Sequence, residues 1–468
     1  MSGELAVAAI DLGATSGRVI VGRVGADRVD LQQVARFANH PVALPDGLHW
    51  DLLHLYAEAL EGLRVAAAAG DLAGVAVDAW AVDYGLLRDD ALIGVPYAYR
   101  DTRGARGVAR VHAEVPFTEL YRRNGLQFLP FNTLYQLSAE TPPGLGANRL
   151  LMIPDLLTYW LSGEAINEVT NASSTGLLDP RTRTWDADLM GRLRIPRGLF
   201  SEPVEPGVRV GVLRGAAAEQ VGVEVPVFTA PSHDTAAAVL AVPMDPERAA
   251  YISCGTWGLV GVETLAPILT DAARAANFTN EGGVDGTTRF LRNVMGLWML
   301  TETLRAWERA GRGVDLVAIL AAASSEPEPV ALLDVDDDVF LAPGRMPERI
   351  DAWLTSRSLP VPTSQAAIVR LIVESLALAF AQTVQAASEL SGVPVERIHV
   401  VGGGSRNALL CQLTADRAGV PVVAGPVEAT ALGNVLAQAR GLGRAGDRAS
   451  VRTLVAASTR LASYVPAR

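Results

Sequence analysis

The chain has 468 residues, enough for two or three domains, and 49% of them are apolar while 19% are charged, so it can bury a large core. Acidic residues outnumber basic ones by 51 to 40, and a chain this acidic is a poor general binder of nucleic acid, whose affinity comes from neutralised phosphates. The sequence contains no lysine, which excludes a P-loop lysine, a lysine Schiff base and a pyridoxal-phosphate lysine.

Cysteine content and hydropathy point to a soluble protein. The two cysteines, Cys254 and Cys411, are too few for a disulfide framework or a cysteine-rich zinc site. The start lacks a positive segment, and Asp11 interrupts the apolar stretch that follows, so no signal peptide is predicted. The most apolar long segment, 366–387, contains an arginine and a glutamate and is not expected to span a membrane. We therefore expect a cytoplasmic protein.

The first half of the chain alternates between strand and turn signals. Residues 11–17 are rich in small side chains and separate two apolar runs. A helix is expected after Trp50, where leucines and a tyrosine recur at helical spacing. Strands are expected at 6–10, 18–24, 29–37 and 75–77.

The second half repeats this opening theme about 240 residues later. A strand at 249–253 leads through the tight turn 254–256 into a second strand at 258–262. Chance could produce one such pairing. The proline-containing segment 242–246 looks like a boundary. We therefore expect an N-terminal domain over residues 1–243 and a C-terminal domain over residues 244–468.

The remaining chain predicts one long helix and one glycine-rich turn. Apolar residues recur on one face from 365 to 390, and Gly392 ends this helix. A strand at 398–401 then runs into a glycine triplet. Residues 327–338 contain two prolines and four aspartates and are expected to form a surface insertion.

The first turn, residues 11–18, has the composition of a phosphate-binding loop. Small residues let backbone N–H groups approach an anion, and two hydroxyls with Arg18 add donors for phosphate oxygens. Asp11 could hold Mg²⁺ through water, because that ion keeps much of its hydration. The alternative is an ordinary hairpin with glycines at positive φ. Residues 255–256 are a shorter candidate of the same kind.

The glycine triplet, Gly402, Gly403 and Gly404, lies between a strand and a helix expected over 408–418. A bare backbone there would let a flat ligand such as a nucleobase lie against it. A plain strand-to-helix turn is the alternative, and the spacing is not that of a dinucleotide-binding fingerprint.

Asp234 is the candidate general base. It follows His233 on a small-residue segment near the expected boundary, and its carboxylate could take a proton from a substrate hydroxyl. The alternative is helix capping by Ser232 or Asp234. Cys254 has no neighbouring base and is expected to be a small buried residue. Two phosphate turns, a nucleoside turn and this aspartate together indicate a kinase that needs no lysine.

With these motifs in this order, the sequence resembles the FGGY carbohydrate kinases over nearly its whole length. Within that family the blocks 127–137 and 293–298 resemble most closely the members that act on L-rhamnulose. The stretches that carry the resemblance are 11–18, 99–103, 127–137, 232–236, 255–257, 280–283, 293–298, 400–404 and 425–429.

The resemblance implies an α/β fold with two actin-like, ribonuclease-H-like domains around a central nucleotide and sugar cleft. It also implies transfer of phosphate from ATP to L-rhamnulose, with Mg²⁺, giving L-rhamnulose 1-phosphate and ADP in L-rhamnose degradation. The partners would be a small sugar and ATP, with no nucleic acid and no membrane.

Roles for individual residues follow from the same resemblance. Asp234 would be the general base on the C1 hydroxyl, and Asp11 would orient the metal. The sugar pocket would be lined by Ala81, His233, Asp234, Thr235 and Asn293. The nucleotide would contact Ala14, Thr15, Ser16, Gly17, Arg18, Thr256, Thr301, Gly402, Gly403 and Gly404.

Two residues depart from the family pattern. Thr301 stands where glutamine is usual, and its shorter side chain puts one nucleotide contact in doubt. Ala81 stands where glycine is usual, and its methyl group could narrow the sugar pocket. Kinase activity on a related ketose such as L-fuculose or D-xylulose, a non-catalytic sugar or nucleotide sensor, and an actin-like filament protein are the alternative functions.

Overall fold

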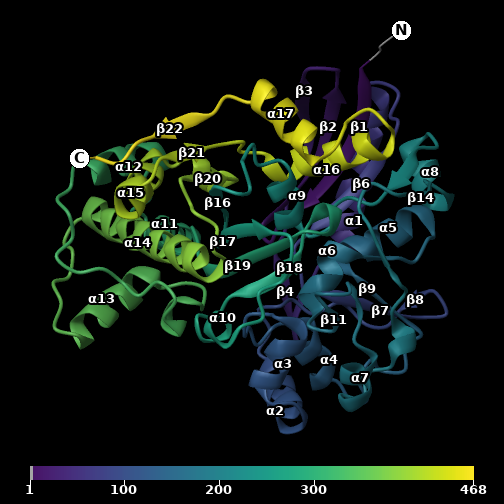
Figure 1. Ribbon diagram of the computed structural model, residues 1–468, viewed down its shortest axis with the longest axis horizontal. Helices are drawn as coiled ribbons and strands as arrows, with labels where there is room; N and C mark the ends of the chain where they lie inside the picture. The colour runs from purple at the N-terminus through teal and green to yellow at the C-terminus, as the bar shows by residue number, and fades with distance from the viewer. Residues whose placement is uncertain (1–3, 468) are drawn as a thin grey trace. The chain divides into compact units, whose positions relative to one another are not determined.

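The computed structural model describes residues 4–467, which divide into two compact units (Figure 1). The first crossing between the units falls after Pro243, where the sequence predicts a boundary. The chain then returns to the first unit at 263–290 and again at 429–459, so a single cut does not separate them. The second unit consists of 244–262, 291–428 and the residues from Arg460 onward.

The first unit is built on a six-stranded mixed sheet. In it β1 pairs antiparallel with β2 and parallel with β6, so β1 is a central strand. The strand order is β14 (Arg209–Val212), β15 (Pro226–Phe228), β6 (Val75–Ala79), β1 (Leu5–Leu12), β2 (Ser16–Val24) and β3 (Val29–Ala38).

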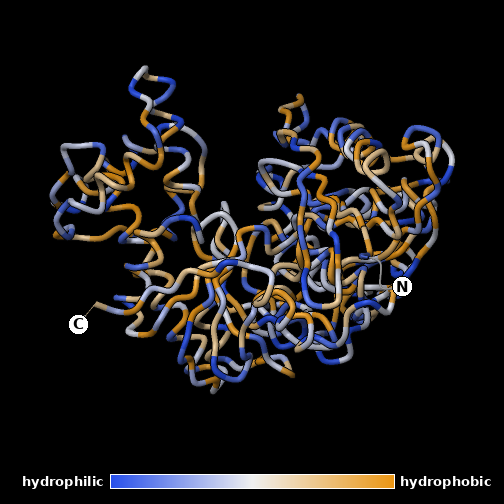
Figure 2. Tube along the Cα trace, turned by 90° about the horizontal axis from the view of Figure 1, so that it is seen from above, coloured by the Kyte–Doolittle hydropathy of each residue, from blue (hydrophilic) through white to orange (hydrophobic). Residues whose placement is uncertain are grey.

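Helices cover this sheet on both faces, which explains why β1 reads as a continuous apolar run. Ile10 and Leu12 pack with leucines of α1 (Leu52–Ala68), whereas Val7 and Ala9, on the opposite face, pack with α16 (Ala429–Gly441). Successive strand residues point to opposite faces, so one strand contributes to two cores. Hydrophobic and hydrophilic stretches are interspersed along the trace (Figure 2).

The remaining elements of the first unit are shorter than the helices α1 and α16. They are β4 (Pro41–Leu44), β5 (Gly47–Trp50), β7 (Tyr84–Arg88), β8 (Ala91–Leu92), α2 (Gly104–Glu114), α3 (Phe117–Asn124), α4 (Thr133–Ala139), β9 (Arg149–Met152), α5 (Ile153–Ser162), β10 (Asn167–Glu168), α6 (Val169–Ala172), β11 (Leu178–Asp179), β12 (Thr184–Trp185), α7 (Ala187–Arg192), β13 (Pro203–Val204), α8 (Gly215–Val221), α9 (Asp234–Leu240), α10 (Asp271–Ala275), β18 (Thr279–Gly282) and α17 (Arg448–Ser458).

The second unit repeats the central pairing of the first. Its strand β16 pairs antiparallel with β17 and parallel with β20, as β1 does with β2 and β6. The internal repeat expected from the sequence is therefore confirmed. Within this unit the strand order is β19 (Thr288–Met295), β17 (Trp257–Thr264), β16 (Ala249–Cys254), β20 (Arg397–Val401), β21 (Val422–Ala424) and β22 (Ala462–Tyr464). The first residues of β19, 288–290, and the last of β17, 263–264, belong to the first unit.

The long helix α14 (Gln365–Ser391) begins and ends close to where the sequence predicts. The Ser364 side-chain oxygen accepts a hydrogen bond from the N–H of Ala367, in the first turn, at 2.9 Å, and Gly392 takes the left-handed conformation at φ 76°. By length and composition α14 is the one helix of residues 4–467 that could cross a membrane, but 67% of its most apolar stretch is buried.

The other helices of the second unit are α11 (Trp298–Arg309), α12 (Leu316–Ser324), α13 (Met346–Ser356) and α15 (Ala408–Ala418), which runs beside α14 (Figure 1).

The expectation of a surface insertion at 327–338 is wrong for its second half. Leu333 and Val335 are only 5% and 2% exposed. The next residue, Asp336, attaches this segment to β19. Its carboxylate accepts hydrogen bonds from the backbone N–H of Met295 at 3.1 Å and from the Arg292 guanidinium at 2.8 Å. The two alternating apolar residues beside the aspartates were the signal that this segment is partly buried.

Candidate active site

Two buried aspartates lie side by side on the central strands of the first unit. Asp11 on β1 is the register partner of Asp78 on β6, and they are 2% and 0% exposed. Arg18, opposite Asp11 on β2, donates to Asp11 Oδ2 at 2.7 Å. Asn434 of α16 donates to Asp78 Oδ2 at 2.6 Å. Burial and the nearby charge of Asp11 raise the pKa of Asp78 well above its usual range.

Asp234 is placed near these carboxylates by the end of β6. The Ala79 N–H donates to the Ser232 carbonyl at 2.9 Å, so the segment that leads into α9 is attached to this strand end. The Asp234 side chain is 31% exposed. Its surroundings raise the pKa of its carboxyl to about 7, first through burial and second through the negative charge of Asp11.

The capping alternative for this segment is not what the structure shows. His233, not Asp234, is the N-cap residue of α9, and it makes no side-chain capping bond. The Ser232 hydroxyl donates instead to the buried carboxylate of Glu168 at 2.8 Å. Asp234 is the first residue of α9, and its Oδ1 accepts a hydrogen bond from the Thr235 hydroxyl at 3.1 Å.

His233 connects Asp234 to a buried ion pair. Its Nε2 lies 3.4 Å from Asp234 Oδ1, and its Nδ1 lies 3.0 Å from a guanidinium nitrogen of Arg289. Glu281 lies 3.4 Å from the same Nδ1. Burial and the positive charge of Arg289 lower the pKa of His233 well below its usual value, so the ring is held neutral.

Ala81 follows β6, and the backbone at this position accommodates the alanine methyl group. Its φ is not in the left-handed region, so alanine strains the backbone no more than glycine would, and its side chain packs partly against the N-terminal core. The unusual conformation falls on Val82, at φ 68°. The Thr133 hydroxyl donates to the Val82 carbonyl at 2.7 Å, and Gln136 also donates to it. These bonds fix the backbone beside Ala81.

The expected phosphate turn is the β1–β2 hairpin. Gly13 N–H donates to the Ser16 carbonyl at 2.9 Å, while residues 14–16 remain half-buried and accessible. Neither Gly13 nor Gly17 has positive φ, so that detail of the hairpin alternative is wrong. Gly17 is required by packing, because a Cβ there would lie 2.1 Å from the Phe37 ring.

In the second unit Thr256 occupies the equivalent turn between β16 and β17. The start of α11 is attached to this turn, because Leu297 N–H donates to the Gly255 carbonyl at 2.9 Å. Thr301 lies in the first turn of α11, with its N–H bonded to the Leu297 carbonyl at 2.8 Å. Asn293 is half-buried on β19. The structure thus brings Thr256 and Thr301 into the same region of this unit.

The glycine triplet packs against the same turn. A Cβ at Gly404 would lie 2.3 Å from Cys254 Sγ, and one at Gly402 would lie 3.1 Å from the Cys254 carbonyl. A Cβ at Gly403 or Gly255 would meet no protein atom within 4 Å, so the fold itself does not require glycine at either place. Open backbone of this kind fits the close approach of a nucleotide.

Cys254 is small and buried, as expected, and burial raises its pKa to about 12. Among residues 4–467 no group of three or more histidine, cysteine or acidic side chains is arranged to hold a metal directly. A single carboxylate such as that of Asp11 is an oxygen ligand of the kind that Mg²⁺ takes when water and a ligand's oxygens complete its coordination.

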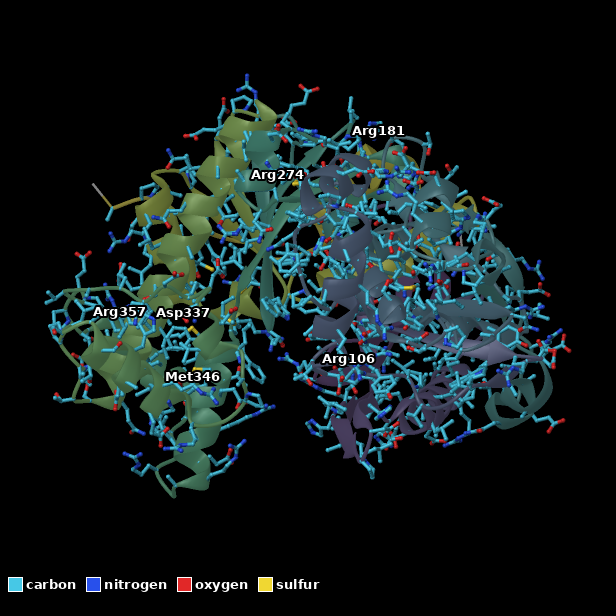
Figure 3. The ribbon with its side chains drawn as sticks, turned by 90° about the horizontal axis from the view of Figure 1, so that it is seen from below. Arg106, Arg181, Arg274, Asp337, Met346 and Arg357 are labelled. Atoms are coloured by element: carbon cyan, nitrogen blue, oxygen red, sulfur yellow. The ribbon has the colours of Figure 1, made fainter. Side chains whose placement is uncertain are left out.

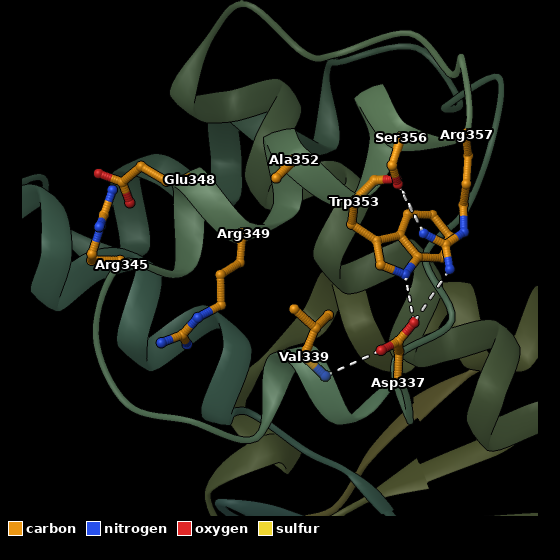
Figure 4. Close-up of a pocket in the computed structure, with 9 residues that line it drawn as sticks. All are labelled: Asp337, Val339, Arg345, Glu348, Arg349, Ala352, Trp353, Ser356 and Arg357. Carbon is orange, nitrogen blue, oxygen red and sulfur yellow. Dashed lines mark hydrogen bonds and ion pairs between the residues drawn. The ribbon is translucent and has the colours of Figure 1, made fainter.

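A separate hollow of about 490 Å³ lies in the second unit beside α13, in the region where Figure 3 labels Asp337, Met346 and Arg357. Several of its charged groups bond to neighbouring side chains or to the backbone. Asp337 accepts from Trp353 at 2.8 Å and from Arg357 at 3.4 Å (Figure 4). Arg349 donates to the Pro343 carbonyl at 2.9 Å.

Sequence reasoning missed four buried groups of the first unit. Asp78 could have been found as an acidic residue inside an apolar strand, and Glu281 lies in a quoted motif to which no role was attached. Glu168 and Arg289 are distant in sequence from the groups that they contact, and no local pattern marks them.

Comparisons with known proteins agree over nearly the whole chain. The model of the FGGY family of carbohydrate kinases, N-terminal domain, matches residues 6–241, and that of the C-terminal domain matches residues 250–442. A rhamnulokinase of Pectobacterium carotovorum is 41% identical, over 98% of this chain and 93% of that protein. A rhamnulokinase of Bacteroides thetaiotaomicron is 39% identical, over 98% and 95%.

Solved structures agree on the fold. A xylulose kinase from Rhodospirillum rubrum superposes with a TM-score of 0.77 at 20% identity, covering 99% of this chain and 94% of that one. A Plasmodium falciparum glycerol kinase with ADP gives 0.76 at 13% identity, covering 98% and 94%. The two units are thus of the actin-like, ribonuclease-H-like α/β type, and the chain belongs to the FGGY family of carbohydrate kinases as an ATP-dependent sugar kinase.

Proposed function

We propose that this kinase transfers the γ-phosphoryl group of ATP to the C1 hydroxyl of L-rhamnulose, giving L-rhamnulose 1-phosphate and ADP in L-rhamnose degradation. The names of its relatives in Pectobacterium and Bacteroides support this substrate. The observation that carries the chemistry is Asp234, a partly exposed carboxylate whose pKa of about 7 suits a general base.

In this mechanism Asp234 accepts the proton of the C1 hydroxyl as the oxygen attacks the γ-phosphorus. The new P–O bond forms as the bond from the γ-phosphorus to the ADP oxygen breaks, so little covalent chemistry is asked of the protein. Positioning then becomes the main task of the site. We assign the sugar contacts to Ala81, His233, Asp234, Thr235 and Asn293.

The nucleotide contacts are assigned to both units. Residues 14–18 of the first unit offer backbone N–H groups, two hydroxyls and a guanidinium to phosphate oxygens. In the second unit Thr256 would contact phosphate, Thr301 would contact the nucleotide, and Gly402, Gly403 and Gly404 would face the adenosine. The open backbone at Gly255 and Gly403 supports this assignment.

We assign Asp11 to orient Mg²⁺ through water. When bound, the ion neutralises negative charge on the phosphates. Arg18 holds the Asp11 carboxylate in place from the opposite strand.

The protein is proposed to work in the cytoplasm, without nucleic acid or membrane. Its net charge of −11 disfavours nucleic acid, and α14 is largely buried within its own unit.

The test is Mg²⁺-dependent ADP release across L-rhamnulose, L-fuculose, D-xylulose, L-ribulose and glycerol, with a control lacking sugar and with the phosphorylated carbon identified by NMR. We expect turnover that is strongest with L-rhamnulose and a phosphate on C1. Preference for another ketose would overturn the substrate assignment. Absence of turnover by folded, ATP-binding protein would overturn the catalytic role and favour a sensor.

A further inference from the structure

The first unit contains a buried arginine, Arg289, that contacts His233, the neighbour of Asp234, and has no role in the proposed mechanism. Arg289 on β19 has a fully buried side chain, and its Nε donates to the Gly282 carbonyl at 3.0 Å. One of its terminal nitrogens lies 3.1 Å from Glu281 Oε2 and 3.0 Å from His233 Nδ1. The arginine thus contacts both a carboxylate and an imidazole.

The contact with His233 determines where the imidazole carries its proton. A guanidinium has donors only, so the Arg289 N–H can bond to Nδ1 only if Nδ1 offers its lone pair. The neutral ring must then carry its hydrogen on Nε2.

The other neutral tautomer of His233, with its hydrogen on Nδ1, also has a possible partner. Glu281 Oε2 lies 3.4 Å from Nδ1 and could accept a hydrogen bond from that atom. Arg289 occupies Nδ1 and prevents this alternative.

The position of that hydrogen matters for Asp234. Nε2 lies 3.4 Å from Asp234 Oδ1, so a hydrogen on Nε2 places partial positive charge beside the carboxylate and favours its ionised form. The other tautomer would place a lone pair beside Asp234 and favour the protonated acid, which cannot act as a base. The positive charge of Arg289 also favours the ionised form of Asp234.

We propose that Arg289 is a positioning residue that fixes His233 as its Nε2–H tautomer and so keeps an N–H, rather than a lone pair, beside the Asp234 carboxylate. The tautomer assignment stands on the geometry alone. Its importance for catalysis rests on the proposed role of Asp234 as the base.

The test compares two variants that break the same ion pair in different ways. Full-length protein with ¹⁵N-labelled histidine is measured by long-range ¹H–¹⁵N NMR, and the His233 signals are identified by their loss in His233→Asn. Wild type should show a protonated, pyrrole-type Nε2 and an unprotonated, pyridine-type Nδ1.

Glu281→Gln should keep this pattern because Arg289 remains. Arg289→Met should move the proton to Nδ1, beside Glu281, or charge the ring. A wild-type ring protonated at Nδ1, or an unchanged pattern in folded Arg289→Met, would overturn the proposal. Arg289→Met leaves Glu281 buried without its partner and can fail to fold, but the wild-type spectrum decides the tautomer without it.

Kinetics test the consequence. Arg289→Met should lower kcat/KM for the sugar by about 10- to 100-fold, as is typical when a group that orients a site residue is lost. The KM for ATP should be unchanged, and Arg289→Lys, which keeps a charged donor, should recover part of the loss. If Asp234→Asn proves fully active while the spectra behave as expected, the proposed function fails and the tautomer assignment stands. If Asp234→Asn is inactive and the spectra do not show the expected tautomer, only this inference fails.

Discussion

The two units share a strand pairing but place different chemistry at the same register position. In the first unit Asp11, one residue before the end of β1, faces Arg18 on β2 and Asp78 on β6. In the second unit the corresponding residue is Ser253 on β16, which faces a leucine on β17 and a valine on β20. One copy of the repeat is charged where the other is neutral.

This difference shows that function lies in the side chains grafted onto a repeated topology. The first unit concentrates carboxylates, and their mutual repulsion and burial raise the pKa of Asp234 to about 7. The second unit offers open backbone at Gly255 and Gly403 instead. Changes in the first unit should therefore affect turnover, and changes in the second should affect nucleotide binding.

The largest effect is expected for Asp234→Asn. Losing general-base help should lower kcat by about 10²–10⁴-fold while the Kd for ATP, measured by calorimetry, stays the same. Asp71→Asn, which changes an exposed aspartate of the same unit, is the matched control and should retain full activity. A kcat near that of wild type would remove Asp234 from the base role.

Gly403→Val should weaken ATP binding and leave general-base catalysis intact. The valine side chain would occupy the open space beside the Gly403 backbone. We expect the KM for ATP to rise at least about tenfold, since a displaced nucleotide loses more than about 1.4 kcal/mol of binding. The KM for the sugar and the thermal midpoint should hardly change. An unchanged KM for ATP would place the nucleotide elsewhere.

Gly404→Ala separates packing from ligand binding. The added methyl would collide with Cys254 Sγ, and overpacking of this kind lowers the free energy of unfolding by about 1–3 kcal/mol. Gly403→Ala, in the same turn but in open space, serves as the control and should leave denaturant midpoints unchanged. Equal stabilities of the two variants would contradict the described contact.

Asp78→Asn is expected to have the smallest effect on activity and a gain in stability. The folded state binds the Asp78 proton more tightly than the unfolded chain, so wild-type stability falls as pH rises above the unfolded pKa of about 4. Asparagine removes that loss and still accepts from Asn434. We expect a higher thermal midpoint than wild type at pH 8 and a similar one at pH 4.

Much of this organisation could be predicted from the sequence, because it depends on local patterns. The strand runs, the end of α14 at Gly392 and the strand–turn–strand repeat all follow from residues close together in the chain. The partners of Asp234 could not be found in this way. Arg289 and Glu168 contact the His233 segment from far along the chain, and only the packed fold shows that Arg289 is paired with Glu281 and that Glu168 accepts from the Ser232 hydroxyl.

The dependence of kcat/KM on pH tests the central claim most directly, since it reports the pKa values of the free enzyme. With Asp234 as the base, log(kcat/KM) for L-rhamnulose should rise with unit slope at low pH and level off near pH 7. The residual activity of Asp234→Asn should lack this rise. A profile that is flat from pH 5 to 8, or an identical rise in Asp234→Asn, would show that the first unit's carboxylate is not the group that takes the proton.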